Sequence, residues 1–271
     1  MQNEEHFDLA AFTVVLLGNG PNVTLPPYQL ALRVTKLEDL VSANEALSSI
    51  RSGDVIGFDT EYRQFRGPHG LFICIVQIAT QDDIFVLDMT QIRDCPSHLR
   101  RILVDTTIIK CGVSLDSDAR MFWDDFAIES YRLVDLGWMI RIAFPMHYRS
   151  NPGGISLQQC VADVLHRYMA KDERKTKWEK GLRGSSSSTQ AATDYAALDA
   201  QAGRELYPIL VKAVEVTSRQ RKTVIPEDWY AYNFIGGRSI RMERDLDGMY
   251  ERWSFQVCRW YKGAVITNFW L

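Results

Sequence analysis

Three short apolar runs stand close together between residues 55 and 89, and they restrict what this chain can fold into. They are Val55–Tyr62, Leu71–Thr80 and Asp83–Met89. The breaks between them have the lengths of hairpin connections, so we expect the three runs to pair consecutively as antiparallel strands. This part of the chain therefore predicts the antiparallel start of a β-sheet.

The chain then alternates between helical and strand-like patterns. Apolar residues at helical spacing predict several helices, one of which precedes the first of the three strands. Pro96 fits the first turn of one helix, and Ser156 fits the cap of another. The predicted helices cover 37–50, 96–104, a segment from 117 onward, 156–169 and 191–216, and the further strands cover 108–113 and 132–139. This order predicts an α/β fold, in which a mixed sheet with its first three strands antiparallel is flanked by helices. A Rossmann fold fits less well, because no glycine-rich turn follows the first strand.

Charge and cysteine content exclude some classes of protein. The 271 residues carry a formal net charge of −3, which excludes a globally basic nucleic-acid binder but not a local basic patch. Residues 141–183 hold nine bases and four acids, which fits either a solvated helix face or a phosphate-contacting edge.

The five cysteines form no CxxC pair, and the chain shows no signal peptide and no membrane-length apolar stretch. We expect an intracellular protein, of the nucleus or cytoplasm, without membrane association.

The first candidate site residues lie on the first of the three strands. Asp59 and Glu61 are two residues apart, so a strand projects both from one face. A solvated edge strand would explain the pair, but the apolar residues before Asp59 favour a buried strand. Buried carboxylates need partners, and Mg²⁺ with its preference for carboxylate oxygens would supply them.

Two further acidic patches follow along the chain. Asp118 comes after a predicted strand and opens a helix, where simple helix capping is the alternative role and Asp116 competes for either one. Tyr195 and Asp199 are four residues apart, so they share a face of the longest helix. A packing tyrosine and an exposed aspartate would also explain this last pair.

Taken in order, these patches resemble a known family. GFDTEY (57–62), KCGVSLDSD (110–118) and YAALD (195–199) are similar to the motifs of the DEDDy branch of 3′–5′ exonucleases, of the Werner-syndrome and ribonuclease D type. LFICIVQIAT (71–80) and RLVDL (132–136) resemble inner strands of that family. The resemblance implies a ribonuclease H-like fold. The sister branch has histidine at the position of Asp194, so this chain resembles the tyrosine branch.

The resemblance also implies a mechanism. Asp59, Glu61, Asp118 and Asp199 would bind two divalent metal ions, Mg²⁺ or Mn²⁺, and Tyr195 would orient the attacking water. The implied activity is hydrolysis at a 3′ end of DNA or RNA with release of nucleoside monophosphates. The residues expected to contact this substrate are Thr60, Tyr62, Phe65, Lys177 and Trp178. A catalytically inactive module that binds RNA or protein is the alternative, and the presence of all four acids and the tyrosine favours the enzyme.

The predicted domain boundaries follow the extent of the resemblance. Residues 1–29 form an N-terminal extension, 30–218 the exonuclease domain and 219–271 an aromatic-rich C-terminal extension. Eleven aromatic residues lie between Trp229 and Trp270, interleaved with arginines. Such a segment can pack on the core, contact substrate or bind a protein partner.

Overall fold

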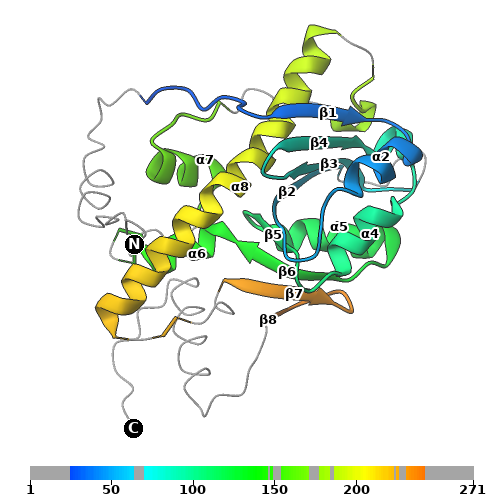
Figure 1. The fold of residues 1–271 in the computed structure, drawn as a ribbon. Coiled ribbons are helices and arrows are strands. Elements are labelled where there is room, and N and C mark those ends of the chain that lie inside the picture. Colours follow the sequence, from blue (N-terminus) through cyan, green and yellow to red (C-terminus); the bar gives the residue numbers. More distant parts are fainter. Residues whose placement is uncertain are drawn as a thin grey trace.

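The computed structural model describes residues 25–63, 70–145, 147–148, 154–170, 177–183, 186–222, 224–225 and 230–241. Within them, eight strands form one sheet in the order β1-β4-β3-β2-β5-β6-β7-β8 (Figure 1). The strands are β1 Arg33–Leu37, β2 Val55–Tyr62, β3 Ile73–Ala79, β4 Asp83–Asp88, β5 Ile109–Gly112, β6 Ser130–Asp135, β7 Ala231–Ile235 and β8 Arg238–Arg241.

The sheet is mixed, and the predicted antiparallel start is present. β2, β3 and β4 pair antiparallel, whereas β1 lies parallel to β4 and β5 lies parallel to both β2 and β6. β7 pairs antiparallel with β6, and β8 pairs antiparallel with β7. The prediction of a mixed sheet flanked by helices is therefore confirmed.

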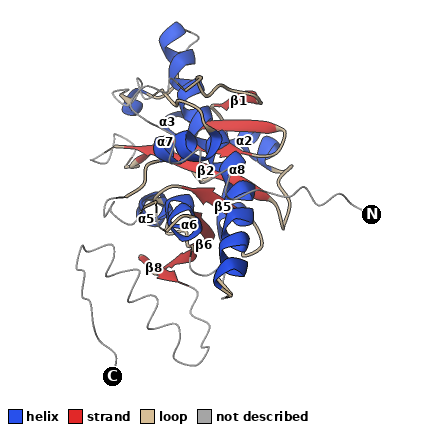
Figure 2. Cartoon of the chain, turned by 90° about the vertical axis from the view of Figure 1, so that its left-hand side faces the viewer, coloured by secondary structure: helices blue, strands red, loops and turns tan. Residues whose placement is uncertain are grey.

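Helices lie on both sides of the sheet (Figure 2). Their bounds are α2 Leu40–Leu47, α3 Met89–Ile92, α4 Ser97–Val104, α5 Leu115–Phe126, α6 Leu136–Ala143, α7 Leu157–Cys160 and α8 Ser187–Arg221. A π-helix at Val161–Leu165 continues α7, and a 3₁₀ turn covers Trp178–Lys180. Among the residues that the structure describes, no helix combines the length and apolar character needed to cross a membrane.

Some predicted boundaries were wrong, for local reasons. Arg33–Leu37 is a strand, and the helix expected from residue 37 begins at Leu40, because Asp39 caps it by accepting from the Val41 and Ser42 amides. The strand expected to reach 139 ends at Asp135, whose carboxylate caps α6. The helix expected to reach 169 ends before His166, which has a left-handed backbone.

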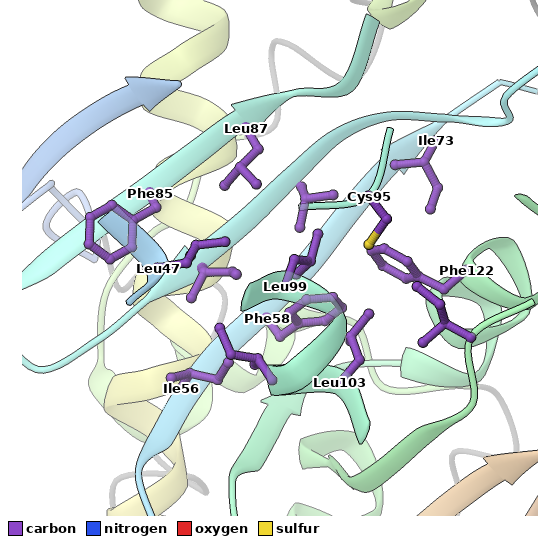
Figure 3. Packing of buried hydrophobic residues seen from close by; sticks show 14 of the residues in the cluster. Leu47, Ile56, Phe58, Ile73, Phe85, Leu87, Cys95, Leu99, Leu103 and Phe122 are labelled. Carbon is purple, nitrogen blue, oxygen red and sulfur yellow. The ribbon is translucent and has the colours of Figure 1, made fainter. Parts of the chain in front are cut away.

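One face of β2 builds a hydrophobic core with α4 and α5. Phe58 is buried against Phe122 of α5, with ring centroids 5.9 Å apart, and Leu99 and Leu103 of α4 belong to the same cluster (Figure 3). The residues of β2 that alternate with Phe58 point to the opposite face. Gly57, Asp59 and Glu61 therefore face away from this core.

The opposite face of β2 is covered by α8, the long yellow helix that runs across the sheet in Figure 1. The helix approaches the strands closely because small residues line the contact: a Cβ on Gly57 would collide with the Ala200 carbonyl oxygen, and one on Gly203 would lie 2.8 Å from the Cys111 carbonyl oxygen. Ala196 and Ala197 are fully buried in the same interface. Glycine and alanine thus set how near α8 comes to β2.

The β7–β8 hairpin extends the sheet beyond the predicted domain boundary at residue 218. Gly236 and Gly237, both with positive φ, turn the chain between the two strands. Phe234 of β7 is fully buried, and Arg120 of α5 lies over its ring. The assignment of domains stays a prediction, and the aromatic residues after Arg241 lie outside the described residues.

Candidate active site

Three of the predicted acids meet where β2 and α8 cross. One carboxylate oxygen each of Asp59, Glu61 and Asp199 lies within 4.8 Å of the others. Asp59 and Glu61 share a face of β2 by strand alternation, and the close packing of α8 brings Asp199 onto that face. Two segments far apart in the sequence thus form one acidic cluster.

Asp118 approaches the same place from α5. Because β2 and β5 are parallel, their carboxyl ends lie at one edge of the sheet, and α5 begins just after β5. Asp118 is buried, and the Thr60 hydroxyl donates a 2.5 Å hydrogen bond to its Oδ1. Asp116, the competing residue, is exposed in the same helical turn.

The electrostatics connect all four acids. Burial and then the charges of Asp118, Asp199 and Glu61 raise the pKa of Asp59 well above its ordinary value. Burial also raises the pKa of Asp118 to about 7, against hydrogen bonds that lower it. Repulsion among carboxylates at this spacing is relieved by a cation or by protonation. The donor set consists of oxygen atoms, which suits hard divalent cations such as Mg²⁺ and Mn²⁺.

Tyr195 lies one turn before Asp199 on α8 and is almost buried. Its ring packs against Trp178, with centroids 6.2 Å apart and planes inclined by 34°. Trp178 is itself buried, whereas the neighbouring Lys177 is exposed. The indole thus contacts the tyrosine that we expect to orient water.

Leu182 attaches the segment 177–183, which carries Trp178, to the neighbouring strands. The Leu182 amide donates to the buried Asp88 carboxylate at 2.6 Å, and the Leu182 carbonyl accepts from the Lys36 ammonium at 2.8 Å. Asp88 also caps α3, so one side chain joins the end of β4 to this segment. These bonds attach the end of the segment that carries Trp178 to β4 and β1.

The remaining predicted substrate contacts are placed differently. Tyr62 is 45% exposed beside the start of α5, where its hydroxyl hydrogen-bonds with Ser117. Burial and the charge of Asp118 raise the pKa of this tyrosine. Thr60 is buried and faces Asp118, and Phe65 lies outside the described residues. The substrate-binding roles of these residues stay predictions.

Sequence reasoning missed one residue beside the site. Gln77 of β3 lies directly opposite Asp59 of β2, and a cross-strand pair shares one face of the sheet. Its side chain is fully buried, and neither amide atom has a hydrogen-bond partner among the described residues. The available signal was the single polar residue in the run ICIVQIA.

Comparison with known proteins shows which family the chain is similar to. A family model described as 3′-5′ exonuclease matches residues 34–215, which is more than half of the chain. A candidate 3′–5′ exonuclease of Acanthamoeba polyphaga mimivirus is 27% identical over 149 residues, which cover 52% of this chain but only 37% of the viral protein. The chain thus matches little more than a third of this relative's length.

Solved structures show the same fold. The catalytic core of RRP6 from Trypanosoma brucei superimposes with a TM-score of 0.56 at 17% identity, covering 73% of this chain and 54% of that one. Escherichia coli RNase D gives 0.54 at 19% identity, covering 72% and 52%. The chain belongs to the 3′–5′ exonuclease family, and the resemblance inferred from its motifs is confirmed.

Proposed function

We propose that this protein is a metal-dependent 3′–5′ exonuclease of the DEDDy type, which hydrolyses the terminal phosphodiester bond and releases nucleoside monophosphates. The observation that carries the proposal is the convergence of Asp59, Glu61 and Asp199, with Asp118 electrostatically coupled to them. Such a cluster is unfavourable without cations, which is the property expected of a two-metal hydrolytic centre.

Each acid has a proposed role. By the resemblance to the family, Asp59 would contact both cations, while Glu61 and Asp199, which lie beside it, would hold the one nearer the attacking water. Asp118 would hold the second from the side of α5. When bound, the two ions would lower the pKa of the attacking water and stabilise charge on the leaving oxygen.

Tyr195 is proposed to orient the water and not to deprotonate it. A phenol hydroxyl both donates and accepts hydrogen bonds, which is what holding a water molecule in one orientation requires. The contact with the buried Trp178 ring restricts the rotation of the phenol. A fixed phenol lowers the entropic cost of placing the water for in-line attack.

RNA is the substrate that we propose to test first. The structural neighbours support this choice, because E. coli RNase D is described as an exoribonuclease involved in structured RNA processing. The exposed side chains of Lys177 and Tyr62 lie at the margin of the site, where they could contact phosphate and a terminal base. The alternative is an inactive module that binds nucleic acid or protein, which the full set of acids disfavours.

The test is degradation of single-stranded RNA labelled at either end, with Mn²⁺ and with EDTA. We expect the 5′-labelled strand to shorten one nucleotide at a time and the 3′-labelled strand to release a labelled mononucleotide at once. Asp59→Asn should abolish both. Asp82→Asn, which changes an exposed acid in the β3–β4 turn, should leave both unchanged. RNA and DNA that stay intact under all conditions, while still being bound, would favour the inactive module.

A further inference from the structure

Thr60 stands between two of the site acids in sequence but points away from them. Asp59 and Glu61 face α8, and strand alternation turns Thr60 toward α5. Its side chain is 5% exposed, and its hydroxyl donates to Asp118 Oδ1 at 2.5 Å. A threonine this buried is poorly placed to contact a nucleic acid, which was the role predicted from the sequence.

The contact of Thr60 belongs to a joint between β2 and the first turn of α5. Two residues further along β2, the Tyr62 hydroxyl hydrogen-bonds with Ser117, the neighbour of Asp118. On its other side, the helix start is held by Asp135, whose Oδ2 accepts from the Ser114 amide at 3.0 Å. These bonds hold the start of α5 in place, whereas the Thr60 hydroxyl donates directly to the carboxylate of Asp118.

We propose that Thr60 is a positioning residue that fixes the rotation of the Asp118 carboxylate for cation binding, and that it is not a substrate contact. The inference rests on the proposed function, since it assigns a partner to one of the proposed metal ligands. Ligating carboxylates are commonly hydrogen-bonded by an outer partner, and loss of that partner lowers metal affinity or activity roughly 10- to 100-fold.

The chain offers a clean set of variants. Thr60→Val keeps the shape of the side chain and removes the hydroxyl, whereas Thr60→Ser keeps the hydroxyl and removes a methyl group. Thr217→Val is the matched control, because Thr217 is also buried and donates a 2.8 Å hydrogen bond to the Ala143 carbonyl on α6, away from the acids. All three are compared with wild type by thermal unfolding without metal.

Two measurements then test the assignment: calorimetric titration with Mn²⁺ alone, and the rate of RNA shortening as a function of RNA and Mn²⁺ concentration. We expect Thr60→Val to bind Mn²⁺ roughly 10- to 100-fold more weakly and to lower kcat with little change in KM for RNA. Thr60→Ser should restore Mn²⁺ binding, and Thr217→Val should bind Mn²⁺ as wild type does.

Several other outcomes would overturn the assignment, and Thr60→Ser decides it if Thr60→Val does not fold. A raised KM with unchanged Mn²⁺ affinity would identify Thr60 as a substrate contact. Wild-type behaviour of Thr60→Val, or failure of Thr60→Ser to restore binding, would assign the residue to packing. If Thr60→Val does not fold, weak Mn²⁺ binding by Thr60→Ser would overturn the proposal and retained binding would support it. A wild type that binds Mn²⁺ but does not shorten RNA would defeat only the proposed function, and one that does not bind Mn²⁺ would defeat both.

Discussion

Two fully buried glutamines in this protein differ in how well their amides are satisfied. Gln201 accepts from the Ala31 amide at 2.9 Å and donates to the Tyr28 hydroxyl and the Gln29 carbonyl, both at 3.0 Å. Gln77, beside Asp59, has no hydrogen-bond partner among the described residues. A buried polar group without a partner costs free energy, whereas a satisfied one contributes to stability.

Substitution by methionine, which has nearly the same shape, should therefore act in opposite directions at these positions. We expect Gln77→Met to raise the free energy of unfolding of the metal-free protein by about 1 kcal/mol and Gln201→Met to lower it by about 2 kcal/mol. Urea denaturation measures both. Destabilisation by Gln77→Met would show that its amide is satisfied in solution.

Lys110 is a buried base, and its environment makes stability depend on pH. Its ammonium donates to the carbonyls of Ile102, Leu103 and Asp105 at the end of α4, and burial lowers its pKa to about 7. Between pH 7 and the ordinary value of 10.5, the unfolded chain binds more protons at this residue than the folded one. Stability contributed by this residue therefore rises with pH over that window.

Lys110→Met should remove this dependence. We expect the free energy of unfolding of wild type, relative to the variant, to increase from pH 7 to pH 9 with a slope of at most about 1.4 kcal/mol per pH unit. Urea denaturation at the two pH values measures the difference, in which other titrating groups cancel. Parallel pH dependence of both proteins would mean that the buried ammonium keeps an ordinary pKa.

At the residue scale, the sequence predicted side chains whose placement follows from local periodicity. Asp59 and Glu61 share a face because a strand has a period of two, and Tyr195 and Asp199 share one because a helix repeats after four residues. The local pattern did not separate Asp116 from Asp118, because both lie in one helical turn and their exposure depends on how α5 packs against β2, so Asp118 was chosen through the resemblance alone. The hydrogen bond from Thr60 to Asp118 could not be predicted either, because it also depends on how α5 packs against β2.

At the scale of elements, the contact between α8 and β2 determines whether the site forms. Sequence periodicity predicted both elements but not the distance between them, which depends on the alignment of Gly57 with Ala200 and of Gly203 with Cys111. The edge strand β1 was missed because it is only partly buried and shows no apolar alternation. β7 and β8 were missed although the chain carries a local signal for them, since Gly236 and Gly237 separate two short runs that pair as a hairpin.

Gly57→Ala should separate α8 from the sheet. The added methyl group would meet backbone atoms of Ala200, which cannot move aside as a flexible side chain can. We expect a loss of at least about 3 kcal/mol in the free energy of unfolding and a loss of RNA shortening. Gly154→Ala, at an exposed position with no atom near the new Cβ, is the control and should stay within about 0.5 kcal/mol of wild type. Equal stability of the two variants would contradict the close packing.

For the whole molecule, the net charge of −3 says little about its partners, because the acids are unevenly placed. Asp59, Glu61 and Asp199 are concentrated at one crossing of helix and strand, and bound cations would reverse the local sign of the charge there. A weakly acidic chain can then bind a polyanion at this point. The fold makes this concentration of acids possible because it brings β2, α5 and α8, which are distant in the sequence, to one edge of the sheet.

The most direct test of the proposed hydrolytic centre compares two aspartates on the same helix. Asp199 is buried in the acidic cluster, whereas Asp194 lies outside it and accepts a hydrogen bond from Gln190 at 2.7 Å. The rate at which a 5′-labelled RNA shortens in Mn²⁺ is measured for wild type, Asp199→Asn and Asp194→Asn. We predict a loss of about a thousandfold for Asp199→Asn, because metal stabilisation of the transition state contributes several kcal/mol, and a near wild-type rate for Asp194→Asn. Equal rates for the two variants would contradict the assignment of this cluster as the active site.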